Sequence, residues 1–411
     1  MSESTLQMDH TNESEGHDDV ARLLASDSIR KFTVPEKTTK TLKILVGIGV
    51  AAIVLGLAFE RESLWASLLV NSYYLLGLGL GAIFLICTLY LTGAAWGIVV
   101  RRISEAMTGI IPVAAAGILI AITLGKSIYP AFTGEEHLVG FKGLWLGYSF
   151  FFVRAFVYIG IWLFFTRAIL SNSRKQDRDG SVGHTHANVK WSAIFIVLFA
   201  LTVWLSSFDW IMSLEPHWFS TIFGVYCFSG IFASSIAATI VIVVWLHGQG
   251  VLRGIITEDH LQDLGKLLLA FTTFWAYIWI SQYLLIWYGD LPEETGYFIV
   301  RTGSVWGPLF LFNVVLNWIV PFFALLPRGT KRNGNILVKI AVVVLIGHWL
   351  DLYLMVYGAT SPGAIPFGLV EVGLALGAVG VFGLVVLKKL SSWPLVPLKD
   401  PYLQESLHHH Q

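Results

Sequence analysis

Ionisable side chains that stand inside apolar stretches are the residues of this sequence best able to do chemistry. They are one arginine, three carboxylates and one histidine: Arg154, Asp209, His348, Asp351 and Glu371. A charged group at the centre of a membrane helix costs about 2.5–3.5 kcal/mol on insertion scales, so such residues usually have a partner or a function. Desolvation favours the neutral form of a carboxyl group, and a carboxyl group near neutrality can exchange protons. The pattern therefore indicates buried ion pairing, proton transfer, or both.

The similar depth of the four charged groups among these residues predicts one shared network. Counting about 1.5 Å per residue from the expected helix ends puts all of them in the outer half of a bilayer. Arg154 is the only cation among them and can pair with one carboxylate through two hydrogen bonds. His348 and Asp351 stand at positions i and i+3, on one helical face, and form a candidate relay. Three interpretations stay open: an ion-paired lock that holds predicted helices 4, 9 and 10 in register, a proton path, and a ligand site, of which the first two are compatible.

A short turn in residues 207–226 brings further candidates to the outer surface. Glu215 is expected to cap a helix that begins at Pro216, because proline is tolerated in a first helical turn. His217 and Trp218 are expected to face the outer interface. Glu215 and His217 are therefore candidates for a proton exit or a partner contact.

Uncharged polar and aromatic residues inside the apolar stretches leave their role open. Asn313 and Asn317 share a helical face at i, i+4, and such residues either join helices by hydrogen bonds or carry a water chain. The stretch 264–288 is rich in aromatic residues, which suits a quinone pocket and lipid-facing packing equally well. Quinone-binding residues therefore stay unassigned.

The elements that position these residues are ten apolar segments. The chain of 411 residues is 55% hydrophobic and 13% charged, about half the charged fraction of soluble domains, which excludes an ordinary soluble enzyme. Continuous apolar runs argue against a β-barrel, whose strands alternate. The predicted fold is an all-α polytopic membrane protein with ten transmembrane helices. They are expected near 44–59, 73–99, 105–125, 146–169, 190–213, 217–246, 264–288, 304–326, 336–357 and 364–388.

The charge of the connecting segments predicts their sides. Most of the 27 Lys and Arg residues fall in the N-terminal tail, the even-numbered loops and the C-terminal tail. By the positive-inside rule both termini are cytoplasmic. Residues 1–42 are expected to be a largely disordered cytoplasmic tail, 43–390 the membrane domain, and 391–411 a cytoplasmic C-terminal tail. The outer loops carry acidic runs, one of them at 135–137.

Several site classes are excluded by the residue counts. Only two cysteines exist, Cys87 and Cys227, which excludes a Cys-ligated iron–sulfur cluster within this chain, a CxxCH haem attachment and a disulfide framework. Only His348 is deep enough to ligate a membrane haem, which argues against one. His184 and His186 fall in a segment, 171–189, expected to be a solvated loop, so no metal site is predicted. A net charge of zero gives no field that would attract nucleic acid. The terminal histidines at 408–410 are given no function.

Two motifs carry a resemblance to a known family. Residues 207–226 (SFDWIMSLEPHWFSTIFGVY) and residues 263–295 (DLGKLLLAFTTFWAYIWISQYLLIWYGDLPEET) closely resemble the F subunit of bacterial alternative complex III. That complex is a quinol:cytochrome c (or cupredoxin) oxidoreductase. The resemblance extends over essentially all ten helices. The F subunit is similar to the C subunit of the same complex, and both resemble the NrfD-like membrane anchors of nitrite and polysulfide reductases.

The resemblance implies a fold, partners and a role. The fold would be two four-helix bundles, helices 2–5 and 6–9, with helices 1 and 10 outside them. The chain would bind no cofactor itself. Haem c and iron–sulfur clusters would belong to multihaem cytochrome and iron–sulfur subunits, and quinol would be oxidised chiefly by the homologous C subunit. This chain would be a scaffold and a candidate proton-conducting element, surrounded by lipids in the bacterial cytoplasmic membrane.

Two other functions compete with this one. A stand-alone secondary transporter would show matched broken helices near the midplane. Pro112, Pro308 and Pro321 interrupt apolar stretches, but they form no matched pair. A purely structural membrane anchor is the other alternative, and in it the buried charges would serve assembly only.

Overall fold

The computed structural model describes residues 32–134 and 139–410, and these are almost entirely helical. Within these two ranges, ten helices are long and apolar enough to cross a membrane, which indicates a multi-pass membrane protein. The first five spans are α3 (Glu36–Phe59), α4 (Arg61–Thr92), a third span made of α5 (Ile98–Met107) and α6 (Ile111–Leu124), α9 (Tyr148–Asp179) and α10 (Val182–Trp210). The last five are α11 (Phe223–Gly248), α12 (Glu258–Gly289), an eighth span made of α14 (Gly307–Val314), a π-helix (Val315–Ile319) and α15 (Val320–Leu325), α17 (Gly334–Thr360) and α18 (Leu369–Leu390).

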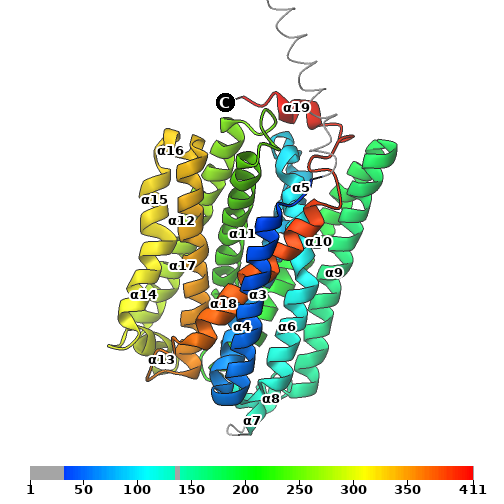
Figure 1. The fold of residues 1–411 in the computed structure, drawn as a ribbon. Helices are drawn as coiled ribbons and strands as arrows, with labels where there is room; N and C mark the ends of the chain where they lie inside the picture. Colours follow the sequence, from blue (N-terminus) through cyan, green and yellow to red (C-terminus); the bar gives the residue numbers. More distant parts are fainter. Residues whose placement is uncertain (1–31, 135–138, 411) are drawn as a thin grey trace, which may run out of the picture.

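The spans run between two distinct ends (Figure 1). One end, here called the C-terminal end, carries α16 (Arg328–Arg332), α19 (Leu403–Leu407) and the C-terminus. The opposite end, here called the hairpin end, carries α7 (Pro130–Thr133), α8 (Gly140–Trp145) and α13 (Pro292–Thr302). The hairpin end corresponds to the side expected from the sequence to face outward.

Two spans form the centre of the molecule. In both α4 and α11, 78% of the residues in the most apolar window are buried, against 17% in α3. Glycines allow the two central helices to touch. A Cβ on Gly81 would lie 2.5 Å from the Cβ of Ser235, and one on Gly77 would lie 3.0 Å from Ile231. Small residues at such crossings let the backbones of membrane helices approach closely.

The first and last spans pack against each other on the outside of this centre. A Cβ on Gly49 of α3 would lie 2.7 Å from the Cα of Gly377 in α18. A Cβ on Gly373 of α18 would likewise lie 2.5 Å from the Cβ of Ala52 in α3. The ends of the membrane domain are therefore joined by direct backbone contact.

Several helices are longer than the apolar runs predicted. α4 begins at Arg61 and not near residue 73, so that only Glu60 separates it from α3. α3 begins at Glu36, inside the expected tail. Residues 171–189 are not a solvated loop, since only Gly180 and Ser181 separate α9 from α10. Helices therefore continue beyond the predicted apolar runs, through apolar and polar residues in 61–72 and through mostly polar residues in 171–189.

The C-terminal tail packs onto its end of the bundle. Leu395 and Val396 are buried, and Asp400 accepts a hydrogen bond from Arg101 at 2.5 Å. Ser406 donates to the carbonyl of Trp96 at 3.0 Å. The acidic run at 135–137 and residues 1–31 of the N-terminal tail lie outside the described residues.

Candidate functional site

Asp351 on α17 lies in the interior with neutral hydrogen-bond donors around it. The residue is 2% exposed. Its carboxylate accepts hydrogen bonds from the Tyr226 hydroxyl, from Trp275 Nε1 at 3.0 Å and from Asn313 Nδ2 at 2.7 Å. These donors come from three different spans: α11, α12 and α14. Among residues 32–134 and 139–410, no cation forms an ion pair with Asp351.

The polar contacts of Asp351 continue along the eighth span. Asn317 Nδ2 donates to Asn313 Oδ1 at 2.7 Å, and both asparagines are buried. Asn317 lies in the π-helix Val315–Ile319, one turn nearer to the C-terminal end. A π-helix is rare and occurs frequently at functional sites, because it displaces one residue from the regular helical register. Here it accompanies a buried row from Asp351 through Asn313 to Asn317.

His348 does not form the predicted relay with Asp351. Its ring is 1% exposed, and neither ring nitrogen has a hydrogen-bond partner in the described protein. The imidazole lies beside the Tyr74 ring at 5.7 Å and against Gly230, whose absent side chain makes room for it. Sharing a helical face therefore does not bring the two side chains into contact.

Arg154 and Asp209 form a buried ion pair. Arg154 donates through Nε and Nη2 to the two carboxylate oxygens of Asp209, at 2.9 and 2.8 Å. Tyr158 and Trp145 donate to the same carboxylate at 3.0 and 2.9 Å. The guanidinium also lies over the Trp145 ring at 4.0 Å, a cation–π contact. The pair therefore locks α9 to α10 next to the hairpin end.

Glu371 is in the first turn of α18 and not deep within the helix, because α18 begins only at Leu369. Its Oε2 accepts from the backbone N–H of Gly368 at 2.8 Å, which caps the helix. Its Oε1 accepts from Ser63 and from Tyr357 at 3.2 Å. Glu371 thus connects α18 to α4 and α17.

The predicted single network of four charged groups is therefore wrong. Within the described part of the chain, no hydrogen bond or ion pair joins Arg154 and Asp209 to Asp351, or either of these sites to Glu371. The lock was predicted between the fourth, ninth and tenth spans. The Arg154–Asp209 pair instead joins the fourth span, α9, to the fifth, α10. The reason is that similar depth fixes only one coordinate, while the rotation of each helix decides which neighbour its side chain meets.

The two candidates from residues 207–226, Glu215 and His217, lie in different environments. Glu215 does not cap a helix at Pro216, because α11 begins only at Phe223. It pairs with Arg301, which donates to Oε1 and Oε2 at 3.3 and 2.9 Å. His217 is exposed, as expected. Trp218, expected at the outer interface, is 5% exposed and stacks on Tyr297 at 4.0 Å.

Arg301 is a functional candidate that the sequence analysis did not single out. It is 1% exposed, and besides Glu215 it donates to the backbone carbonyls of Tyr297, Leu354 and Met355. Burial raises the pKa of the nearby Tyr297 phenol above its ordinary value. The aromatic pair Tyr297 and Phe298, both buried and one turn before Arg301, was the available signal in the sequence.

No three His, Cys, Asp or Glu side chains in the described residues gather as a metal site. Cys87 and Cys227 are free and buried. Neutral donors alone hold the Asp351 carboxylate, whereas Asp209 and Glu215 are paired with the guanidinium groups of Arg154 and Arg301. In comparisons with known proteins, no family model and no curated protein matches this chain.

Proposed function

We propose that this chain is a cofactor-free membrane subunit of a respiratory quinol:cytochrome c (or cupredoxin) oxidoreductase of the alternative complex III type. Partner subunits with haem c and iron–sulfur clusters oxidise quinol and transfer electrons. This chain contributes a bilayer scaffold and a protonatable site. The resemblance of residues 207–226 and 263–295 to that family motivates the assignment. Each motif supplies one hydrogen-bond donor to the Asp351 carboxylate: Tyr226 comes from the first motif and Trp275 from the second.

The observation that carries the proton role is the neutral surrounding of Asp351. Three neutral donors on three spans hold its carboxylate, so the group can gain or lose a proton without breaking an ion pair. Removing the charge of Asp209 would instead leave the Arg154 guanidinium buried without its counter-charge. Asp351 with Asn313 and Asn317 is therefore the proposed proton-carrying site, and Arg154–Asp209 the proposed lock.

The proposed arrangement has two four-helix bundles. One comprises α4, the third span, α9 and α10, and the other comprises α11, α12, the eighth span and α17, with α3 and α18 outside both. The contacts of α9 with α10, of α11 with α12 and α17, and of α3 with α18 support this division. The proposed location is the bacterial cytoplasmic membrane, with the C-terminal end in the cytoplasm, because Lys and Arg are concentrated in the segments of that end.

The variant Asp351→Asn tests the proton role in the purified complex reconstituted into vesicles. The amide keeps the shape of the side chain but cannot exchange a proton. Proton transfer by a positioned group contributes roughly 10²–10⁴-fold to a rate. We therefore expect the rate of proton release to fall at least about tenfold. Co-purification of the haem and iron–sulfur subunits reports assembly.

Asp290→Asn is the matched control, because Asp290 is exposed at the turn that ends α12. Glu371→Gln is a second control, since glutamine retains an acceptor for the Gly368 N–H. Unchanged proton release in Asp351→Asn with full assembly would refute the proton role and leave an anchor. Purification of the chain without redox subunits, together with substrate transport, would refute the family assignment and favour a transporter.

A further inference from the structure

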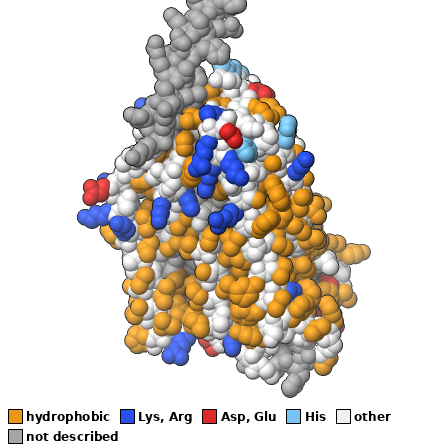
Figure 2. Space-filling view, turned by 90° about the vertical axis from the view of Figure 1, so that its right-hand side faces the viewer, with side chains coloured by type: hydrophobic (Ala, Val, Ile, Leu, Met, Phe, Trp, Pro, Cys, Tyr) orange, Lys and Arg blue, Asp and Glu red, His pale blue; other side chains and the backbone are white. Residues whose placement is uncertain are grey.

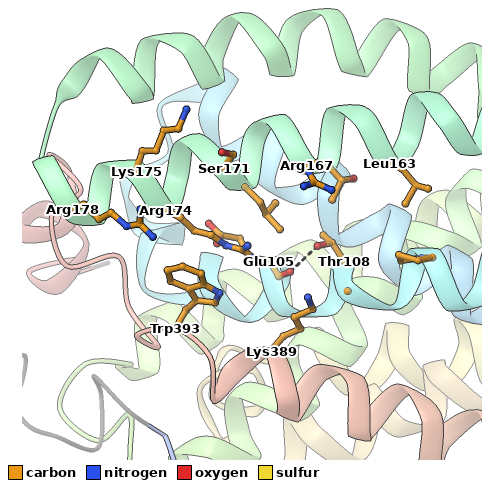
Figure 3. A pocket seen from close by; sticks show the side chains of 14 residues that line it. Glu105, Thr108, Leu163, Arg167, Ser171, Arg174, Lys175, Arg178, Lys389 and Trp393 are labelled. Carbon is orange, nitrogen blue, oxygen red and sulfur yellow. Dashed lines mark hydrogen bonds between the residues drawn. The ribbon is translucent and has the colours of Figure 1, made fainter.

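We infer that a groove at the C-terminal end of the bundle binds the phosphate headgroup of an anionic phospholipid. The groove lies between α9, the third span and the end of α18, and encloses about 640 Å³. Figure 3 shows side chains from these three elements around it. This inference does not depend on the proposed respiratory function.

Five cations line the groove: Arg167, Arg174, Lys175, Arg178 and Lys389. The four on α9 recur at helical spacing and so share one side of the helix. None of the five forms an ion pair with a carboxylate of the described chain. Their positive charge is therefore available to an external anion.

The one acidic residue that lines the groove forms its ion pairs with arginines other than these five. Glu105 accepts from Arg102 at 2.5 Å and from Ser173 at 2.6 Å, and Arg101 lies 3.7 Å away. Arg102 also pairs with Asp177. The Glu105 carboxylate is thus bound by Arg101 and Arg102, which do not line the groove.

Two cations are held toward the groove by packing. The guanidinium of Arg174 lies over the Trp393 ring at 4.7 Å, and its Nε is buried without a hydrogen-bond partner in the protein. Lys389 packs its methylene groups against Gly109, where even a Cβ would lie 3.0 Å from Lys389 Cγ. Its ammonium points into the groove (Figure 3). These contacts orient charge for a phosphate group, which accepts several such donors at once.

The surroundings select a lipid over a soluble anion. Phe164, one turn before Arg167 on α9, is 57% exposed, and Val113 and Ile120 on α6 are each 46% exposed. Figure 2 shows Lys and Arg gathered in the upper half of this face, next to an extensive hydrophobic surface. A ligand with a phosphate above and hydrocarbon chains below matches both parts. Basic pockets between membrane helices are known to bind such headgroups.

Native mass spectrometry or a binding titration of the full-length chain in detergent tests the inference. The probes are dioleoyl-phosphatidylglycerol, dioleoyl-phosphatidylcholine and glycerol 1-phosphate. We expect phosphatidylglycerol to bind tightly and the other two weakly. Each cation near an anionic lipid contributes about fivefold to the affinity. The variant Arg174→Gln/Lys389→Gln, which removes two of them, should therefore weaken phosphatidylglycerol binding about 30-fold. Arg174→Lys, which keeps the charge, should retain most of the affinity.

Lys388→Gln is the matched control, because Lys388 neighbours Lys389 on α18 but does not line the groove. An unchanged melting temperature of each variant in detergent shows that folding is intact. Equal affinity for phosphatidylcholine would overturn the inference, as would equal weakening by Lys388→Gln. Equal affinity for glycerol 1-phosphate would show a site for soluble phosphate compounds and would also overturn it.

Discussion

The buried carboxylates Asp209 and Asp351 differ in the groups that donate hydrogen bonds to them. Asp209 is held by a guanidinium, a phenol and an indole, whereas Asp351 is held by neutral donors alone. Two buried aspartates therefore have different partners. Asp209 joins two helices through its ion pair, and Asp351 is the carboxylate that we propose to carry protons. The chemistry follows from the partner and not from the residue type.

Breaking the Arg154–Asp209 pair should destabilise the protein strongly. Arg154→Met leaves the Asp209 carboxylate buried without its cation, and removing one partner of a buried pair costs about 3–5 kcal/mol. Arg154→Met/Asp209→Leu removes both charges and should recover much of that loss. The measurement is the free energy of unfolding in mixed micelles of mild detergent and dodecyl sulfate.

Glu258→Gln is the control for this cycle. Glu258 pairs with Arg332, but its side chain is 68% exposed, so the change should be within about 1 kcal/mol. Additive losses in the double variant would contradict the assignment of Arg154–Asp209 as one coupled unit.

At the scale of single residues, the sequence indicated the charged groups but not their partners. Arg154, Asp209 and Asp351 are evident because charge inside an apolar run is rare. Tyr226, Trp275 and Asn313 carry no such mark, since tyrosine, tryptophan and asparagine occur throughout membrane helices. Their convergence on Asp351 depends on how α11, α12 and α14 are rotated.

At the scale of elements, helix contacts depend on where glycines fall. Gly373 and Gly377 show the small-residue spacing typical of membrane helix packing, and both lie against α3. Glycine is abundant in this chain, with 39 residues, so spacing alone could not distinguish contact positions from exposed ones. Gly47, on the same α3, faces outward, and a Cβ added there would meet no atom within 4 Å.

Alanine at Gly377 and at Gly47 should act in opposite directions. In Gly377→Ala the new methyl group would lie 2.7 Å from the Cα of Gly49, so α3 and α18 must separate. Overpacking of this kind costs about 1–3 kcal/mol. Gly47→Ala should stabilise α3 by up to about 1 kcal/mol through helix propensity. Thermal unfolding of both variants in detergent is the measurement, and equal shifts would contradict the contact.

Helix boundaries show a further limit at this scale. Residues 61–72, 171–179 and 182–189 are helical although they interrupt or flank the apolar runs. Hydropathy reports the part of a helix that faces hydrocarbon, whereas backbone hydrogen bonding continues past that part until a turn ends the helix. Gly93 and Gly180, both with positive φ, mark two such ends.

At the scale of the whole molecule, the sequence was sufficient for the class and the number of spans. Ten apolar runs predicted ten crossing helices, and ten are present in the described residues. The packing order was not accessible, because an apolar run shows that a helix leaves water without showing which helix it meets. The pairing of α3 with α18 joins segments about 330 residues apart and follows from their close glycine contacts.

The distribution of charge over the whole molecule predicts its orientation. Glu293→Cys on α13 and Ser392→Cys after α18 place thiols on exposed positions at opposite ends. Both native cysteines are buried and give little background. A membrane-impermeant maleimide should label Glu293→Cys in intact cells and Ser392→Cys only in inverted vesicles. The reverse pattern would contradict a cytoplasmic C-terminal end.

The contact between α3 and α18 also has a consequence for synthesis. α3 enters the bilayer first, yet the surface it packs against is translated last. At about 5–20 residues per second, the newborn helix would wait roughly 20–60 s among lipids before its neighbour arrives. Packing of α3 against α18 is thus a late event in biogenesis, and in a chain truncated before residue 369 the glycine face of α3 would lack its partner.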